Sequence, residues 1–270
     1  MSTATVGIGL HGALGRMGVR LIQLIAEDPR VRLVAAIDRE AHPKLGQDAG
    51  ELAGIGRLDV PIEPLSALEK RQGVDVVIDF SHPSASLELA TVCARNGIAL
   101  VVGTTGFEPE QRKTLEAASA TIPILLSPNM SRAVNLLMKL VGEAAAALAG
   151  VADIEIVERH HHLKKDSPSG TALKLAEIAA TASGADHLVH GREGLVGERK
   201  PGEIGVHAVR SGDCPGEHTV SFGLLGETLE LSHRALNRDG FVRGAIDSAR
   251  FLAGKPAGWY SMANVLDFAQ

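Results

Sequence analysis

The sequence predicts an α/β protein, with a Rossmann-type doubly wound parallel sheet and a second, α+β domain that carries an open mixed sheet. Over the first 130 residues, short apolar runs alternate with stretches of helical periodicity, which is typical of a parallel sheet covered by helices. From Val151 onward the pattern changes to longer strands with only one helix between them. A chain of 270 residues is long enough to bury a core in each part.

The elements of the first part follow from the points where apolar runs start and stop. Asp28-Pro29 ends the first helix, because proline has no N–H and clashes with the preceding turn. Gly97 caps another helix. The expected strands are 5–10, 31–37, 75–79, 98–102 and 122–126, and the expected helices are 17–27, 84–96, 109–120 and 130–148.

The second part contains fewer and longer elements. The expected strands are 151–159, 203–210, 217–223 and 227–233, with one helix at 170–183 between them. A further helix is expected at 237–253, followed by a short tail from Trp259. The Gly-rich stretch from Gly184 to Gly205 predicts a mobile loop.

The segment Glu158-Arg-His-His-His-Leu-Lys-Lys-Asp-Ser-Pro-Ser-Gly-Thr171 places proton-transfer groups directly before a helix start. Ser167 fits the N-cap and Pro168 the first helical position. The amides of residues 169–171 then lack intrahelical acceptors and lie at the positive end of the helix dipole, which suits a carboxylate or a phosphate. The segment therefore predicts an enzyme that acts on a small acidic substrate.

Lys164 lies four residues beyond His160 in this segment. On an extended strand the two side chains would share one face, while Lys165 would point to the opposite face. This spacing makes Lys164 a candidate proton donor beside His160.

Two other interpretations of the same segment remain open. The three histidines, together with Glu158 or Asp166, could hold a metal ion, although strand alternation turns His161 away from its two neighbours. A solvated basic strand end would explain the charges, but it would not explain the Ser-Pro-Ser-Gly-Thr turn beside them.

A glycine-rich turn, Gly9-Leu-His-Gly-Ala-Leu-Gly-Arg-Met-Gly18, lies between the first strand and the first helix. Glycines there permit a tight turn and a close approach of the backbone to a pyrophosphate. Two registers fit, and the apolar face that starts at Met17 favours a phosphate turn at residues 11–17. Asp38, at the end of the next strand, suits the ribose hydroxyls of NADH, whereas Arg39 could meet the 2′-phosphate of NADPH. An ordinary charged β-turn is the alternative for this pair.

Two further loops follow strand ends, Gly103-Thr-Thr-Gly-Phe107 and Ser127-Pro-Asn-Met-Ser131. In a doubly wound sheet, ligands bind at the carboxyl ends of the strands, so both loops should line the nicotinamide crevice. The alternative is routine turn chemistry, since glycine, proline, threonine and asparagine all favour turns.

Composition narrows the function classes. A net charge of −5 without long runs of like charge argues against a nucleic-acid partner, and 3% aromatic residues leave few stacking platforms. No segment approaches the length of a membrane span, so no membrane partner is expected. Cys93 and Cys214 lie far apart with no CxxC partner, which favours a reduced, cytoplasmic protein.

Three motifs together resemble the dihydrodipicolinate (4-hydroxy-tetrahydrodipicolinate) reductase family: Gly12–Gly18, Gly103–Phe107 and Glu158–Thr171. The resemblance covers nearly the whole chain. It implies reduction of 4-hydroxy-tetrahydrodipicolinate, a small dicarboxylate, to tetrahydrodipicolinate in the diaminopimelate pathway of lysine biosynthesis, with NADH or NADPH and no metal. It also implies a dinucleotide-binding domain at 1–130 plus 238–270, a substrate-binding and oligomerisation domain at 131–237, and a homotetramer assembled through the sheets of the second domain.

The resemblance also implies roles for individual residues. His160 and Lys164 match the catalytic positions, and the substrate-binding positions are His161, Lys164, Ser169, Gly170 and Thr171. The cofactor-binding positions are Gly12, Ala13, Leu14, Gly15, Arg16, Met17, Asp38, Arg39, Gly103, Thr104, Thr105, Ser127, Pro128, Asn129 and Met130. Some relatives have Glu in place of Asp38 and an aromatic residue in place of Met130, and Leu163 replaces a polar residue, which leaves the choice between NADH and NADPH open.

Two rival functions are distinguishable by experiment. A metal-dependent hydrolase would use the three histidines, would contain stoichiometric zinc and would lose activity to a chelator. A non-catalytic NAD-sensing protein would keep the glycine turn and bind cofactor without turnover. In that second case, His160, Lys164 and the anion site would have no purpose.

Overall fold

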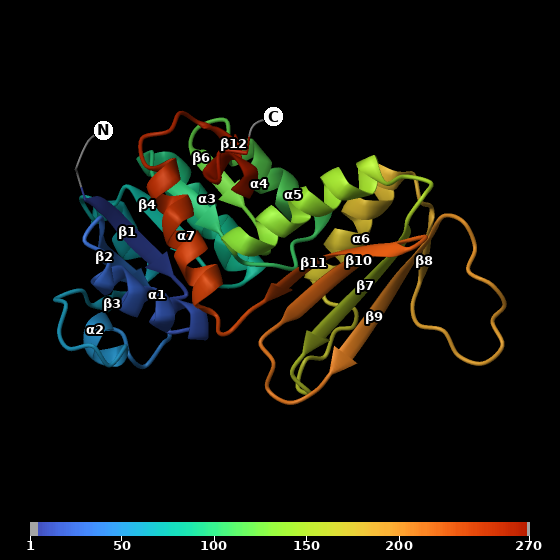
Figure 1. The fold of residues 1–270 in the computed structure, drawn as a ribbon. Helices are drawn as coiled ribbons and strands as arrows, with labels where there is room; N and C mark the ends of the chain where they lie inside the picture. Colours follow the sequence, from blue (N-terminus) through green and yellow to red (C-terminus); the bar gives the residue numbers. More distant parts are fainter. Residues whose placement is uncertain (1–4, 269–270) are drawn as a thin grey trace. The chain divides into compact units, whose positions relative to one another are not determined.

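The computed structural model describes residues 5–268, which form two compact units. Of these residues, the first unit contains 5–132 and 241–268, and the second contains 133–240. The chain therefore leaves the first unit once and returns to it near its carboxyl end (Figure 1).

The first unit is built on a seven-stranded parallel sheet. In spatial order its strands are β12 (Gly258–Tyr260), β6 (Pro123–Leu126), β5 (Ala99–Val102), β4 (Val76–Asp79), β1 (Val6–His11), β2 (Val31–Ile37) and β3 (Ile62–Glu63). The order reverses between β1 and β4, where His11 and Asp79 are paired in register at the two carboxyl ends. Such a reversal is the topological switch point at which open α/β sheets bind ligands.

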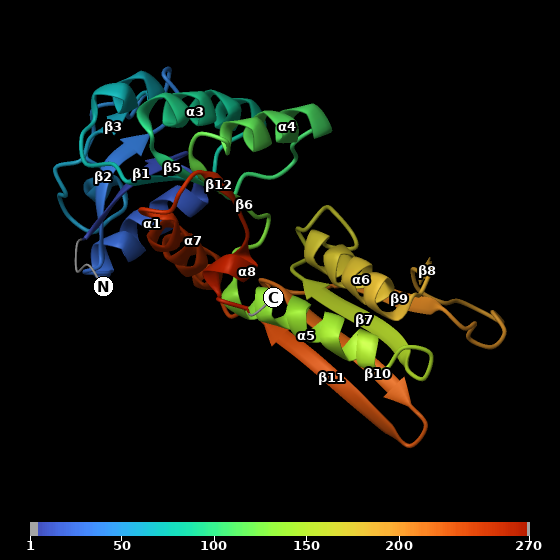
Figure 2. The ribbon, with the colours of Figure 1, turned by 90° about the horizontal axis from the view of Figure 1, so that it is seen from above.

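Helices cover both faces of this sheet, because its buried strands are apolar on both sides. Val76 and Ile78 pack in a core with α1 (Arg16–Glu27) and α7 (Asp239–Leu252), while Val77 packs on the other face. The helices of that other face are α3 (Pro83–Asn96) and α4 (Pro109–Ala118), and Figure 2 shows the two pairs on opposite sides of the strands. The expected doubly wound sheet is confirmed.

Several short elements of the first unit were not expected from the sequence. Asp48 caps α2 (Ala49–Leu52) by accepting the amides of Gly50 and Glu51, and the 3₁₀ helix η1 (Leu65–Lys70) follows β3. The short tail expected from Trp259 is wrong, since Trp259 lies within β12 and pairs with Ile124 of β6. Strands β3 and β12 have two and three residues, which is too few to show apolar alternation in the sequence.

The second unit carries a five-stranded mixed sheet, as expected. Its order is β11 (Glu227–Arg234), β10 (Glu217–Leu224), β7 (Asp153–His160), β9 (Glu203–Arg210) and β8 (His187–Val189). β7, β9 and β8 run parallel, while β10 is antiparallel to both of its neighbours. Helices α5 (Arg132–Ala147) and α6 (Gly170–Ser183) supply the apolar side chains that cover one face.

The segment from Gly184 to Gly205 is more structured than a mobile loop. It contains β8 and the start of β9. Between those strands, Arg192 and Arg199 both contact the carboxylate of Glu155 on β7, which ties the connection to the sheet. The sequence does not reveal these contacts because the partners are more than 35 residues apart.

Candidate active site

In the second unit, the helix-covered face of the sheet changes from apolar to polar at one end. Along β7 that face presents, in order, Ile154, Ile156, Glu158 and His160, all of them buried. Strand pairing places Glu158 opposite His218 of β10, and His218 opposite His233 of β11. One carboxylate and three imidazoles therefore gather where β7 ends.

The carboxylate of Glu158 has no exposed surface and is held by three groups. Arg210 donates to both of its oxygens at 2.8 Å, the Ser169 amide donates at 3.0 Å, and His160 Nδ1 lies at 2.6 Å. Burial alone would raise the pKa of Glu158, but these hydrogen bonds outweigh it and lower the pKa below its usual value. Glu158 is therefore ionised at neutral pH.

An ionised carboxylate can only accept, so Nδ1 of His160 must carry the proton that joins it to Glu158. This contact fixes the imidazole ring and leaves Nε2 for chemistry. Gly216 borders that nitrogen: a Cβ at residue 216 would lie 3.0 Å from Nε2. A glycine at this position keeps Nε2 uncovered.

His218 and His233 lie beside Glu158 and His160 and are neutral at neutral pH. Burial lowers the pKa of His218 to about 4, and the nearby rings of His160 and His233 add repulsion in the same direction. Burial also lowers the pKa of His233. The His218 ring lies 5.3 Å from the His160 ring in an edge-on arrangement, and its Nε2 is 3.1 Å from Ser169 Oγ.

The helix expected at 170–183 is confirmed as α6, but the expected cap is wrong by two positions. The N-cap is Ser169 and not Ser167, and Pro168 lies before the helix. The Ser169 hydroxyl accepts the Ala172 amide, as an N-cap should. The Ser167–Pro168 peptide bond is cis.

The physical reason for this shift is the buried Glu158 carboxylate. It takes the Ser169 amide and so holds that residue in an extended conformation immediately before the helix. The Ser169 amide therefore donates to Glu158 and is not available to a ligand, contrary to expectation. Gly170 and Thr171 become the first two helical residues, whose amides precede the first intrahelical bond, from Leu173 to Ser169.

Lys164 does not lie on an extended strand, so the shared-face argument is also wrong. β7 ends at His160, the His161 amide donates to Cys214, and the Lys164 amide donates back to His161 in a turn. The Lys164 ammonium contacts both oxygens of Asp166 at 2.8 and 2.9 Å. A turn, rather than strand register, therefore sets the position of Lys164.

The three consecutive histidines have separate surroundings. His160 is held by Glu158, whereas His162 Nδ1 lies 2.9 Å from the Gly212 carbonyl. Nδ1 of His161 is buried and has no hydrogen-bond partner within residues 5–268. Over the same residues, no group of three or more His, Cys, Asp or Glu side chains is arranged to hold a metal ion.

In the first unit, the glycine turn runs from the end of β1 at His11 to the start of α1 at Arg16. Gly12 has φ +77, and a Cβ there would lie 2.3 Å from the Phe80 carbonyl, so this position requires glycine. α1 has no side-chain cap at Gly15 and no acidic residue in its first turn. Its start is therefore open and electropositive, which suits a pyrophosphate.

Asp38 lies beside this turn and is already partly engaged. One carboxylate oxygen accepts the Leu14 amide and the other accepts the Arg39 amide, both at 2.9 Å. Each oxygen has a second lone pair, so the carboxylate can still accept a ribose hydroxyl. The Arg39 side chain is exposed. Both groups expected to choose between the two cofactors thus lie at the edge of the glycine turn.

In the other two predicted cofactor loops, 103–107 and 127–131, some residues are exposed and others are buried. Thr105 is exposed, but Thr104 is buried and its hydroxyl bonds within the protein. Met130 is 2% exposed and packs in the core, so only its backbone can face a ligand. Ser127 and Pro128 lie at the surface of their loop, where the Ser127 hydroxyl donates to the Asn129 carbonyl.

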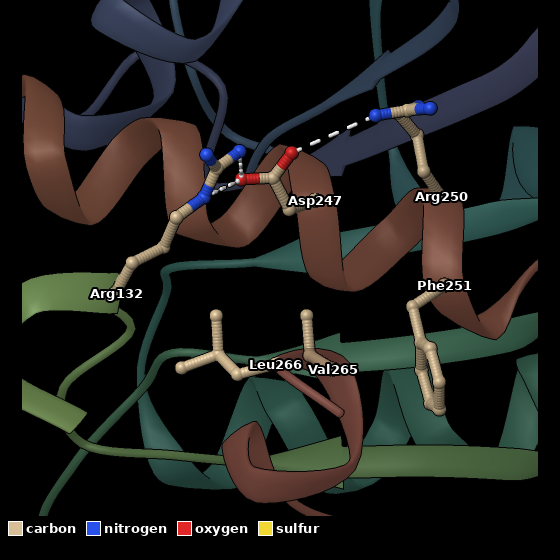
Figure 3. A pocket seen from close by; sticks show the side chains of 6 residues that line it. All are labelled: Arg132, Asp247, Arg250, Phe251, Val265 and Leu266. Atoms are coloured by element: carbon tan, nitrogen blue, oxygen red, sulfur yellow. Dashed lines mark hydrogen bonds and ion pairs between the residues drawn. The ribbon is translucent and has the colours of Figure 1, made fainter. Parts of the chain in front are cut away.

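A separate pocket lies in the first unit and contains none of the expected site residues. Figure 3 shows Arg132 and Arg250 on either side of Asp247, above an apolar wall. Phe251, Val265 and Leu266 form that wall. Asp247 pairs with both arginines, so the contact joins the start of α5 to α7 and neutralises part of the charge.

Four residues of the polar cluster in the second unit have roles that the sequence does not predict. The sequence suggests Glu158 only as a metal ligand, and it gives no role to Arg210, His218 or His233. A partial signal exists, because His218 and His233 occupy core positions of alternating strands in which a polar residue is unusual. Their convergence on His160 depends on strand order.

Models of the two halves of one family match the chain. "Dihydrodipicolinate reductase, N-terminus" matches residues 6–130, and "Dihydrodipicolinate reductase, C-terminus" matches 133–266. The chain is 50% identical over 266 residues to a 4-hydroxy-tetrahydrodipicolinate reductase from Anaeromyxobacter sp. (strain Fw109-5), covering 97% of each chain. It is 47% identical to the protein of that name from Syntrophotalea carbinolica, covering 97% of this chain and 98% of the relative.

Among solved structures, one similar chain is the dipicolinate-bound dihydrodipicolinate reductase from Paenisporosarcina sp. TG-14. It shows a TM-score of 0.78 and 25% sequence identity, and the match covers 97% of this chain and 99% of that one. The similarity therefore extends over both units.

A doubly wound sheet with an open glycine turn, joined to a buried acid–histidine cluster, defines an oxidoreductase that uses a nicotinamide cofactor. More narrowly, the chain belongs to the dihydrodipicolinate reductase family. It is a reductase of the diaminopimelate route to lysine.

Within the described part of the chain, no helix has both the length and the apolar character needed to cross a membrane.

Proposed function

We propose that this protein reduces 4-hydroxy-tetrahydrodipicolinate to tetrahydrodipicolinate with NADH or NADPH, and that the cluster around His160 binds and protonates the substrate. The observation that carries the proposal is the Glu158–His160 pair, which fixes an imidazole near the start of α6. The dipicolinate bound by the related Paenisporosarcina enzyme is a compact dicarboxylate of the kind that such a site would hold.

The anion-binding part of the site rests on the start of α6. A substrate carboxylate would lie at the amides of Gly170 and Thr171, where the helix dipole is positive. His161 would add a hydrogen bond through its unpartnered Nδ1. Ser169 contributes through its hydroxyl, which caps the helix and contacts His218, and not through its amide.

The proton-transfer part of the site rests on Lys164 and His160. Reduction of a carbon–nitrogen double bond leaves negative charge on the substrate, so a positioned acid must supply a proton. Lys164 is the group proposed for this step, and its contact with the exposed Asp166 can be exchanged for a substrate carboxylate. His160, oriented by Glu158, would share the proton or hold the substrate in place.

NADH or NADPH supplies the hydride when it is bound. The residues proposed to hold it are the glycine turn, Asp38, Arg39, the Gly103–Thr105 loop and the Ser127–Met130 loop. The fit is supported by the tight turn that Gly12 permits against Phe80 and by the open start of α1. All of these residues flank the carboxyl ends of the strands.

The test follows the oxidation of NADH and of NADPH separately, with enzymatically generated substrate. We expect turnover with at least one cofactor, and turnover should survive treatment with a chelator. Cofactor binding without turnover would instead favour an NAD-sensing protein. Loss of activity on chelation, together with stoichiometric zinc, would favour a metal-dependent enzyme.

We predict that the cofactor choice is made by Asp38 and Arg39. Asp38→Ala should raise the KM for NADH more than that for NADPH, because only NADH presents a free 2′-hydroxyl to the carboxylate. Arg39→Ala should do the reverse, since the 2′-phosphate loses its counter-charge. Steady-state kinetics with both cofactors measures this. Equal effects on both cofactors from both variants would show that the adenosine ribose binds elsewhere.

We also propose that the protein is cytoplasmic, with reduced Cys93 and Cys214, and that it is a homotetramer assembled through the second sheet. The face of that sheet turned away from α5 and α6 includes Val157, which is 41% exposed. Burying such a face against another copy stabilises an assembly. Light scattering should give the mass of four chains, and Val157→Asp should give a smaller species. A monomeric wild type would refute the tetramer.

A further inference from the structure

A buried polar network occupies the switch point of the first sheet, and the proposed function gives no role to the carboxylate at its centre. At its centre lies Asp79, the last residue of β4, which has no exposed surface. No lysine or arginine contacts its carboxylate among the described residues. A buried carboxylate is costly unless several donors satisfy it, so this network has to be specified by the surrounding sequence.

Four side chains meet the two oxygens of Asp79. His11 Nδ1 at 2.8 Å and Ser81 Oγ at 2.5 Å contact Oδ1. Ser86 Oγ at 2.5 Å and Thr104 Oγ1 at 2.8 Å contact Oδ2. These donors come from the end of β1, the β4–α3 turn, the first turn of α3 and the loop after β5.

Thr104 is the member that reaches a proposed cofactor loop. Its hydroxyl donates its single hydrogen to Asp79 and accepts the Ser81 amide at 2.9 Å. The hydroxyl therefore has no hydrogen left for a ligand. Asp79 also accepts the Gly103 amide through its backbone carbonyl at 2.9 Å, so it holds two successive residues of the loop.

We propose that Asp79, through Thr104, sets the conformation of the Gly103–Thr105 loop for cofactor binding, and that Thr104 is a positioning residue whose side chain does not itself bind the cofactor. The inference rests on the proposed cofactor site. It revises the role of Thr104 from a contact made by its hydroxyl to a contact that orders the backbone beside Thr105, the exposed residue of the loop.

Ser86 provides a matched control, because it also donates one hydroxyl hydrogen to Asp79 Oδ2 but lies on α3, outside the loop. Thr104→Val and Ser86→Ala each remove one donor from the same oxygen. If the network only stabilised the fold, both variants would lower the melting temperature and neither would change cofactor affinity selectively.

The experiment measures the dissociation constant for NADH by calorimetry, the melting temperature, and kcat and KM for the wild type, Thr104→Val, Thr104→Ser and Ser86→Ala. Thr104→Val should raise the NADH dissociation constant roughly ten-fold, with kcat at saturating NADH and the KM for substrate nearly unchanged. Thr104→Ser keeps the hydroxyl and should bind NADH within about two-fold of the wild type. Ser86→Ala should lower the melting temperature while leaving NADH affinity intact.

Wild-type affinity in Thr104→Val would overturn the inference, as would an equal loss of affinity in Thr104→Ser or in Ser86→Ala. If Thr104→Val does not fold, the Thr104→Ser and Ser86→Ala pair still decides the matter, because a weakened Thr104→Ser or Ser86→Ala refutes the role of this hydroxyl. Failure of the wild type to bind either cofactor would refute the proposed function itself, a result distinct from any difference among the variants.

Discussion

Lys164→Ala should lower kcat by roughly 10²–10⁴-fold, the usual range for a lost general acid. The ammonium is the proposed proton donor and also a charge that attracts the substrate carboxylates, and truncation removes both. Affinity for NADH should hardly change, because the residues proposed to bind the cofactor belong to the first unit. The measurement is steady-state kinetics combined with NADH calorimetry on the same preparation.

This loss should not arise from unfolding. The partner of Lys164 in the structure is Asp166, whose side chain is 63% exposed, so removing the lysine leaves no buried charge. Lys165→Ala is the control: Lys165 is exposed, and no contact joins it to the polar cluster. If Lys164→Ala kept a near-normal kcat, or if Lys165→Ala were the variant that lost kcat, Lys164 would not be the acid.

Acid should destabilise this protein through His218. Its pKa is about 4 in the folded chain against about 6.5 for an ordinary histidine, so the unfolded chain binds more protons between these values. The stabilisation is therefore complete above pH 6.5 and is lost as the pH falls toward 4. At about 1.4 kcal/mol per pKa unit, the loss amounts to about 3 kcal/mol. Chemical denaturation across this range measures it.

Besides burial, the charged and titratable groups that affect the pKa of His218 are Glu158, His160, His233 and Lys164. His218→Gln separates its contribution, since glutamine does not titrate and its carbonyl can still accept the Ser169 hydroxyl. The difference in stability between wild type and variant should change with pH by about 3 kcal/mol over this window. A difference that stays constant from pH 7 to pH 4 would contradict the assigned cause.

The sequence alone determined most of the first unit, because its signals are local. β2 at 31–37 has the predicted bounds, and α3 ends at Gly97, which adopts the left-handed conformation that glycine favours. The glycine turn is similarly local, since strand, turn and helix follow one another within about a dozen residues. Alternation of apolar runs was therefore enough to give the doubly wound sheet.

The details of the 158–171 segment required the tertiary structure. The shared-face argument for Lys164 assumed an extended chain beyond His160, and the N-cap was expected at Ser167, because Ser-Pro is a good local start signal. In the folded chain Glu158, buried by strand pairing and bound by Arg210, takes the Ser169 amide, and the N-cap is Ser169. A contact across 52 residues thereby overrides a local preference.

The amino-acid sequence by itself determined the fold class and the family, and it supplied the side chains proposed to be reactive, since these depend on residue types and short spacings. Only the tertiary structure decided which groups surround them: Glu158 behind His160, neutral His218 beside it, and Asp79 behind Thr104. Each of these arrangements joins residues on different strands or on the loops between elements. The physical reason is that burial and pKa depend on which strands become neighbours, and local propensity carries no information about that order.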